Sequence, residues 1–134
     1  MIKTRNVGKE GYRNYLRKAD EYAEAMQEEY AQGRFNTCTL CAIHCGISAA
    51  DALTIFFKGV RHAGERHEDV VQLIETLDLD KEIIKAKVRQ LLNILTEKNR
   101  VEYEEKLTTE SGAAMAVKNA ERFLFWVKSV LPTN

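Results

Sequence analysis

Arg61, His62 and His67, in the stretch from Gly59 to His67, are of the types that bind or cleave phosphodiesters. Five residues separate Arg61 from His67. We expect His67 to open a short helix, whose positive end disfavours imidazolium and leaves a neutral base near pH 7. A neutral imidazole that removes the 2′-hydroxyl proton and a guanidinium that stabilises the phosphorane can together cleave RNA without a metal. The segment is therefore a candidate ribonuclease motif.

The same residues also fit a structural role. Arg61 can form a salt bridge within a loop, and His67 can cap a helix, with Asp51, Glu65 and Glu68 as the acidic partners in reach. A short spacing between arginine and histidine arises often by chance in a chain in which 30% of the residues are charged. The motif by itself therefore leaves catalysis and structural pairing both open.

A line of polar side chains runs along the otherwise apolar segment 38–57. His44, Ser48 and Asp51 are spaced i, i+4 and i+7, which places them on one face of a helix. Because the other faces are apolar, this line faces water, a cavity or another subunit. It is either the solvated edge of the helix or a groove wall, from which hydrogen bonds reach Tyr103 or an arginine. A Ser-His-Asp triad is disfavoured, because the middle of a regular helix supplies no oxyanion hole.

The three cysteines, Cys38, Cys41 and Cys45, lie in the same apolar segment. Their odd number and close spacing make a poor disulfide framework and suit a reducing compartment. A structural zinc site usually joins ligand pairs from two separated segments, and this sequence has a single cluster. The Glu-x-x-His pairs of a di-iron bundle are missing as well. We therefore expect no metal and no cofactor, and we interpret the cysteines as small buried side chains.

The elements that carry these residues follow from helical periodicity. Apolar residues recur every three or four positions over residues 11–31, which predicts an amphipathic helix that Gly33 closes. A more apolar helix should begin with Asn36 or Thr37 as its N-cap and end before Gly59. The sequence then predicts a short helix over 67–77, a fourth helix capped by Asp80 with 98–100 at its C-terminal end, and a last helix over 111–131.

No segment alternates with the period of a β-strand, and the only proline is Pro132, so nothing interrupts these helices. The expected fold class is all-α, an antiparallel four-helix bundle with an additional short helix. We expect one domain, residues 1–134, with 1–8 as a flexible N-terminus. Basic and acidic residues number 20 each, so no net charge draws the chain to nucleic acid or membranes. Since no apolar run approaches a membrane span, we expect a cytoplasmic protein without membrane contact.

These segments together resemble the HEPN family, the higher eukaryotes and prokaryotes nucleotide-binding domains. The resemblance is clearest in residues 42–53, which read AIHCGISAADAL, continues through 59–67 and ends near 98–103. It implies a HEPN-like helical bundle, a homodimer and, in many members, a ribonuclease whose motif is an arginine, four to six intervening residues and a histidine. Arg61, His62 and His67 carry over to that motif. In many ribonuclease members the motif lies toward the last helices, whereas here it lies mid-chain.

The resemblance implies RNA or nucleotides as ligands, held at a homodimer cleft where a two-fold axis brings two copies of Arg61 and His67 together. For some members it also implies a toxin whose antitoxin is a minimal nucleotidyltransferase. The alternative is a non-catalytic helical interaction module that binds a protein partner, such as a nucleotidyltransferase, through an apolar face. Phe125 favours this alternative, because it lies on the otherwise polar side of the last helix.

Overall fold

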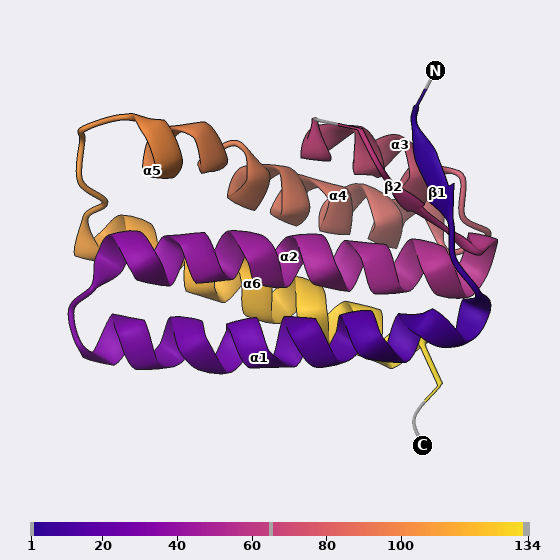
Figure 1. Cartoon of the computed structure of the whole chain (residues 1–134), viewed down its shortest axis with the longest axis horizontal. Coiled ribbons are helices and arrows are strands. Elements are labelled where there is room, and N and C mark those ends of the chain that lie inside the picture. The colour runs from indigo at the N-terminus through magenta and orange to yellow at the C-terminus, as the bar shows by residue number, and fades with distance from the viewer. Residues whose placement is uncertain (1, 65, 133–134) are drawn as a thin grey trace.

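Four long helices pack against one another in the computed structural model, which describes residues 2–64 and 66–132 (Figure 1). They are α1 (Tyr12–Ala31), α2 (Phe35–Lys58), α4 (Lys81–Leu95) and α6 (Glu110–Val130). The connections between them contain two helices of six residues, α3 (Val70–Glu75) and α5 (Lys98–Tyr103), and the 3-10 turn η2 (His67–Asp69), while a second 3-10 turn, η1 (Lys9–Gly11), precedes α1. The predicted all-α fold class is confirmed.

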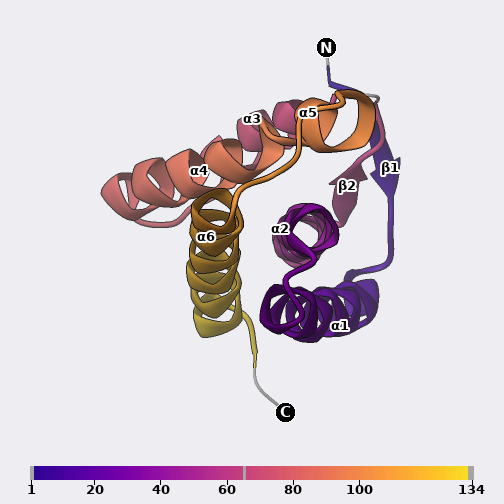
Figure 2. The same cartoon turned by 90° about the vertical axis from the view of Figure 1, so that its left-hand side faces the viewer.

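The most apolar helix, α2, lies at the centre of the molecule, between α1 and α6 (Figure 2). With its 24 residues it is long and apolar enough to cross a membrane, although we expected no such run from the sequence. In its most apolar window, however, 67% of the residues are buried inside the bundle, as in the core helix of a globular domain. Its fully buried side chains, such as Ile43 and Leu53, pack with Leu91 and Phe123 in one core.

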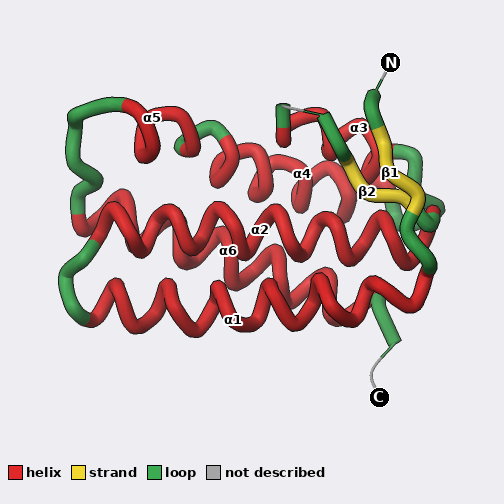
Figure 3. The backbone as a smooth tube through the Cα atoms, in the orientation of Figure 1, coloured by secondary structure: helices red, strands yellow, loops and turns green. Residues whose placement is uncertain are grey.

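A small antiparallel ribbon joins the N-terminus to the end of α2 (Figure 3). Strand β1 (Thr4–Asn6) pairs with β2 (Val60–His62), and Arg5 lies opposite Arg61. Gly59 turns the chain from α2 into β2 with φ 68°, a left-handed conformation that favours glycine. The sequence indicated a flexible segment 1–8 and no strand, because three-residue strands are too short to show alternation. The ribbon packs on α2 and so fixes where Arg61 lies.

The start of α2 differs from the prediction. The helix begins at Phe35 with Arg34 at its N-cap, and neither Asn36 nor Thr37 caps it. Instead, the Asn36 side-chain carbonyl accepts a hydrogen bond of 2.8 Å from the backbone N–H of Thr108. A residue with good capping chemistry is therefore used to hold a distant loop against the bundle.

The end of the fourth helix differs as well, although its beginning is confirmed. The Asp80 carboxylate caps α4 by accepting hydrogen bonds from two backbone N–H groups in its first turn. The helix ends at Leu95, and residues 98–100 begin α5 rather than completing α4. At this break the Thr96 hydroxyl donates to the carbonyl of Asn93. Since no glycine or proline marks the break, the sequence gives no stop signal there.

Candidate functional site

A groove between α1, α2 and β2 joins Arg61 to the polar line of α2. Its volume is about 570 Å³, and we call it the α1–α2 groove. The polar line of α2 therefore faces a groove, and Arg61 reaches this groove from β2. A groove wall with an arginine in reach was one of the arrangements predicted from the sequence. The lining residues are Tyr15, Lys18, Glu21, Tyr22, Ala25, His44, Ser48, Asp51 and Arg61.

Asp51 is the most buried charged residue of this groove, with only 7% of its surface exposed. Its carboxyl oxygens form no hydrogen bond or ion pair within residues 2–64 and 66–132. Burial raises the pKa of the Asp51 carboxyl from its ordinary value of 3.8 to about 7, and the charges of Arg61 and Lys18 only partly oppose that rise. The groove therefore holds a carboxyl group that is difficult to ionise and that has no partner among the described residues.

An aromatic pair lies in the same groove, two helical turns before Asp51. The half-buried imidazole of His44 stacks on the ring of Tyr22, with centroids 5.3 Å apart and planes inclined by 27°. Tyr22 keeps 36% of its surface exposed. Burial lowers the pKa of His44, Glu102 opposes this effect, and Lys98 adds to it. The groove thus offers a largely neutral imidazole and a tyrosine ring at its rim.

Arg61 lines the α1–α2 groove, whereas the imidazole rings of the two histidines of the predicted motif pack together outside the groove lining. Alternate residues of a strand point to opposite faces, so Arg61 and His62 diverge, and the groove lining includes neither His62 nor His67. The guanidinium of Arg61 donates to the carbonyl of His62 at 2.9 Å. His62 is 4% exposed, and its ring packs against the ring of His67 with the centroids 5.8 Å apart. Within one chain, the guanidinium and the candidate base therefore belong to different clusters.

His67 has the low basicity that we expected from the sequence, but for a different reason. Burial lowers the pKa of His67 first, and the positive charges of Lys98, His62 and His44 lower it further. His67 does begin the short helical segment, as the first residue of the 3-10 turn η2 that leads into α3, but burial and neighbouring charges are the causes of the shift rather than the helix N-terminus. The charge of His44 contributes to lowering the pKa of His67, and His44 also lines the α1–α2 groove. His44 therefore lies between the two clusters.

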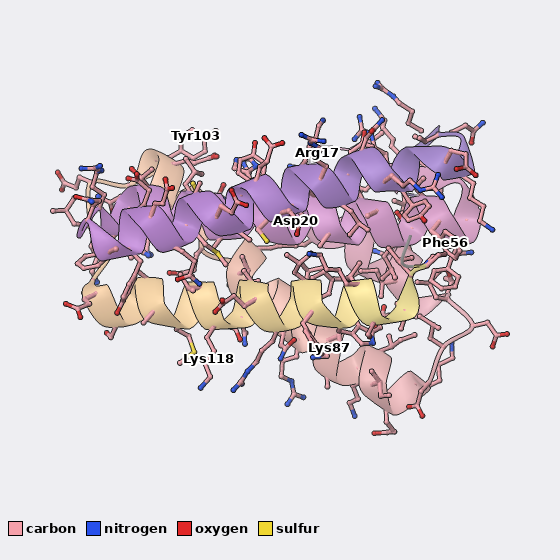
Figure 4. All side chains as sticks on the ribbon, turned by 90° about the horizontal axis from the view of Figure 1, so that it is seen from below. Arg17, Asp20, Phe56, Lys87, Tyr103 and Lys118 are labelled. Carbon is pink, nitrogen blue, oxygen red and sulfur yellow. The ribbon has the colours of Figure 1, made fainter. Side chains whose placement is uncertain are left out.

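Helix α5 borders the His67 cluster. The Lys98 ammonium donates to the Glu102 carboxylate at 2.9 Å, and this hydrogen bond lowers the pKa of Glu102. Tyr103, which was predicted as a partner of the polar line, is 78% exposed and is not part of the groove lining. Figure 4 shows it at the outer edge of the molecule.

The cysteines pack as side chains of the bundle interior. Cys38 and Cys45 are buried and Cys41 is half-buried, and all three are free thiols. Burial raises the pKa of Cys38 to about 11 and that of Cys45 to about 12, so neither is a ready thiolate. Within the described part of the chain, no three His, Cys, Asp or Glu side chains come together as a metal site would require.

The wall that α1 contributes was missed from the sequence. Tyr15, Lys18 and Tyr22 follow the spacing i, i+3 and i+7, which places them on one edge of α1. Both tyrosines belong to the apolar periodicity of residues 11–31, and the polar Lys18 between them interrupts it. This mixed edge was the signal that could have located the groove.

Comparison with solved structures supports the fold. No protein-family model matches the sequence, and no curated protein matches it. Among solved structures, the chain is similar to a crystal structure of an archaeal HEPN homologue, with a TM-score of 0.67 and 18% sequence identity. The match covers 88% of this chain and 95% of that chain. At this identity the likeness concerns the fold, and the predicted resemblance is confirmed at that level.

Proposed function

From the HEPN-like fold and the groove that it carries, we propose that the chain binds RNA or nucleotides and that Arg61 contacts their phosphate. The observation that supports this proposal is the meeting of a guanidinium, an imidazole and a tyrosine ring from three separate elements. A guanidinium suits the geometry of a phosphate, and an exposed aromatic face suits a base. Because the formal net charge is zero, attraction for the backbone has to come from a local site such as this one.

Titration of a fluorescein-labelled single-stranded RNA, followed by anisotropy at low salt, tests the binding. Arg61→Ala should weaken the affinity by about tenfold, since a charge-assisted contact to phosphate is lost. Arg122→Ala is the matched control, because Arg122 lies exposed on α6 and outside the groove. Equal affinities for both variants and the wild type would contradict a phosphate contact by Arg61.

The finer proposal is a metal-independent endoribonuclease that works as a homodimer. Within one chain Arg61 faces the groove while His67 packs against His62. We propose that Arg61 of one chain and His67 of the partner subunit act on the same phosphodiester, because a two-fold axis duplicates each group at the interface. The neutral imidazole would remove the 2′-hydroxyl proton, and the guanidinium would stabilise the charge on the phosphorane.

Mixed dimers test this shared site. In the presence of EDTA, Arg61→Ala and His67→Ala should each abolish cleavage of a labelled RNA. When the two variants are refolded together in equal amounts, about half of the dimers are mixed, and each mixed dimer holds one intact site out of two. Activity should therefore recover to about a quarter of the wild-type value. No recovery would contradict a site shared between subunits, and two inactive single variants exclude a contaminating ribonuclease.

A second candidate function, a non-catalytic interaction module, is favoured by one observation. Phe125 is 77% exposed on α6, beside a groove of about 660 Å³ between α1 and α6. An aromatic ring so exposed is typical of a contact surface. We propose that this surface would hold a protein partner, such as a nucleotidyltransferase-like antitoxin. If so, Phe125→Glu should abolish co-purification of the partner, whereas the nearby Lys118→Glu should leave it intact.

A further inference from the structure

We infer that the α1–α2 groove reads the base of its ligand and that Asp51 selects guanine over adenine. This inference rests on the proposed binding of RNA or nucleotides. Asp51 is 7% exposed and lines the groove, and its carboxyl oxygens form no hydrogen bond or ion pair within the described part of the chain. The Asp51 oxygens are not among the fully buried unpartnered atoms of the described chain, so they are open to the groove, where a ligand can supply the donors that they lack.

Guanine is the base whose donors fit a carboxylate. Its Watson–Crick edge carries N1–H and the 2-amino group side by side, and an ionised carboxylate accepts such a pair with its two oxygens. Adenine offers its 6-amino group next to the N1 lone pair, which would face a carboxylate oxygen. Cytosine likewise has a ring lone pair, and uracil has one N–H between two carbonyls. Only guanine therefore satisfies both Asp51 oxygens.

The other groove residues can hold the rest of a guanosine nucleotide. His44 and Asp51 are seven residues apart in α2, about 10 Å along the helix axis, which leaves room for one base between them. The Tyr22 ring, stacked on His44 and 36% exposed, offers a face to that base. Arg61 and Lys18 supply positive charge for the phosphate. A volume of about 570 Å³ accommodates such a ligand.

Labelled pentanucleotides of sequence UUNUU, with 2′-O-methyl sugars so that no cleavage occurs, test the inference. The wild-type protein at pH 8 should bind the RNA with central guanosine about tenfold to a hundredfold more tightly than the RNA with central adenosine. Inosine, which lacks the 2-amino group, should bind with intermediate affinity. Equal or tighter binding of the adenosine RNA would overturn the inference.

Asp51→Asn should change the preference rather than merely weaken binding. The asparagine amide donates to the 2-oxo group of xanthine and accepts from N1–H, so this variant should bind the xanthosine RNA more tightly than the guanosine RNA. Asp78→Asn, the same chemical change at an exposed position between α3 and α4, should keep the guanosine preference. If Asp51→Asn keeps it too, the inference fails.

The failure of this inference can be told apart from the failure of the proposed function. RNA binding that depends on Arg61 but shows no base preference would overturn base reading by Asp51 and leave the proposed function in place. The absence of any RNA binding would overturn both.

Discussion

Replacing Asp51 by asparagine should stabilise the folded chain at alkaline pH, although Asp51 belongs to the candidate site. In the folded chain burial raises the pKa of this carboxyl to about 7, whereas in the unfolded chain the pKa returns to about 3.8. Between these two values the folded chain holds a proton that the unfolded chain has released. The free energy of unfolding therefore falls as the pH rises through this window and then stays constant above it.

The magnitude follows from the width of the window. Each pH unit corresponds to about 1.4 kcal/mol, so the ionised Asp51 carboxylate destabilises the fold by at most about 4 kcal/mol above pH 7. Asparagine fills nearly the same volume without a charge. We expect Asp51→Asn to raise the free energy of unfolding by about 2 to 4 kcal/mol at pH 8. At pH 4 the gain should be close to zero, because the folded carboxyl is then neutral in the wild type as well.

Urea denaturation followed by circular dichroism, at intervals from pH 4 to pH 8, measures this difference. Arg61 and Lys18, whose charges act on the Asp51 carboxyl from other elements, are present in both the wild type and the variant, so the comparison isolates the carboxyl. The exposed control Asp78→Asn should show no trend with pH. A stability difference between wild type and Asp51→Asn that does not vary with pH would refute the reasoning, as would a less stable variant at pH 8.

Three further predictions concern the scaffold. Asn36→Ala should lower the free energy of unfolding in urea by about 1 to 3 kcal/mol, because the buried N–H of Thr108 loses its acceptor; an unchanged midpoint would show that water replaces it. Gly59→Ala should lower it by about 1 to 2 kcal/mol, because alanine adopts a φ of 68° only with strain, and no loss would argue against the left-handed turn. Cys38 and Cys45 should resist iodoacetamide at pH 8 in the folded chain and react fully in concentrated urea, as mass spectrometry can measure; rapid modification without urea would contradict their burial.

The helices and the resemblance could be predicted because their signals are local. The apolar run of α2, the Asp80 cap and the glycines at 33 and 59 each act within a few residues, and the ends of α1 and α2 and the start of α4 follow from them. The spacing of His44, Ser48 and Asp51 likewise places them on one helical face by periodicity alone. Of the two alternatives for this polar line, the solvated edge of the helix and a groove wall, the structure shows the groove wall.

The remaining features depend on contacts between distant segments. Whether Arg61 lies near Asp51 or near His67 depends on the face of β2 from which the Arg61 side chain projects. Strand β2 in turn depends on its pairing with residues 4–6. The use of Asn36 to hold residue 108 is a contact across 72 positions. The pKa of His67 depends on Lys98, which the sequence pattern assigned to a helix end rather than to α5. Helical periodicity carries no information on such pairings.

The pairing of β1 with β2 has a practical consequence for anyone who prepares this protein. Backbone hydrogen bonds from Ala63 to Lys3 and from Val7 to Gly59 extend the ribbon at both ends. Residues 3–7 therefore pair along the whole strand that carries Arg61. An affinity tag fused before Met1, or a truncation that deletes residues 1–6, would disturb the same strand that an activity assay is meant to examine. A tag placed after residue 134 avoids that confusion.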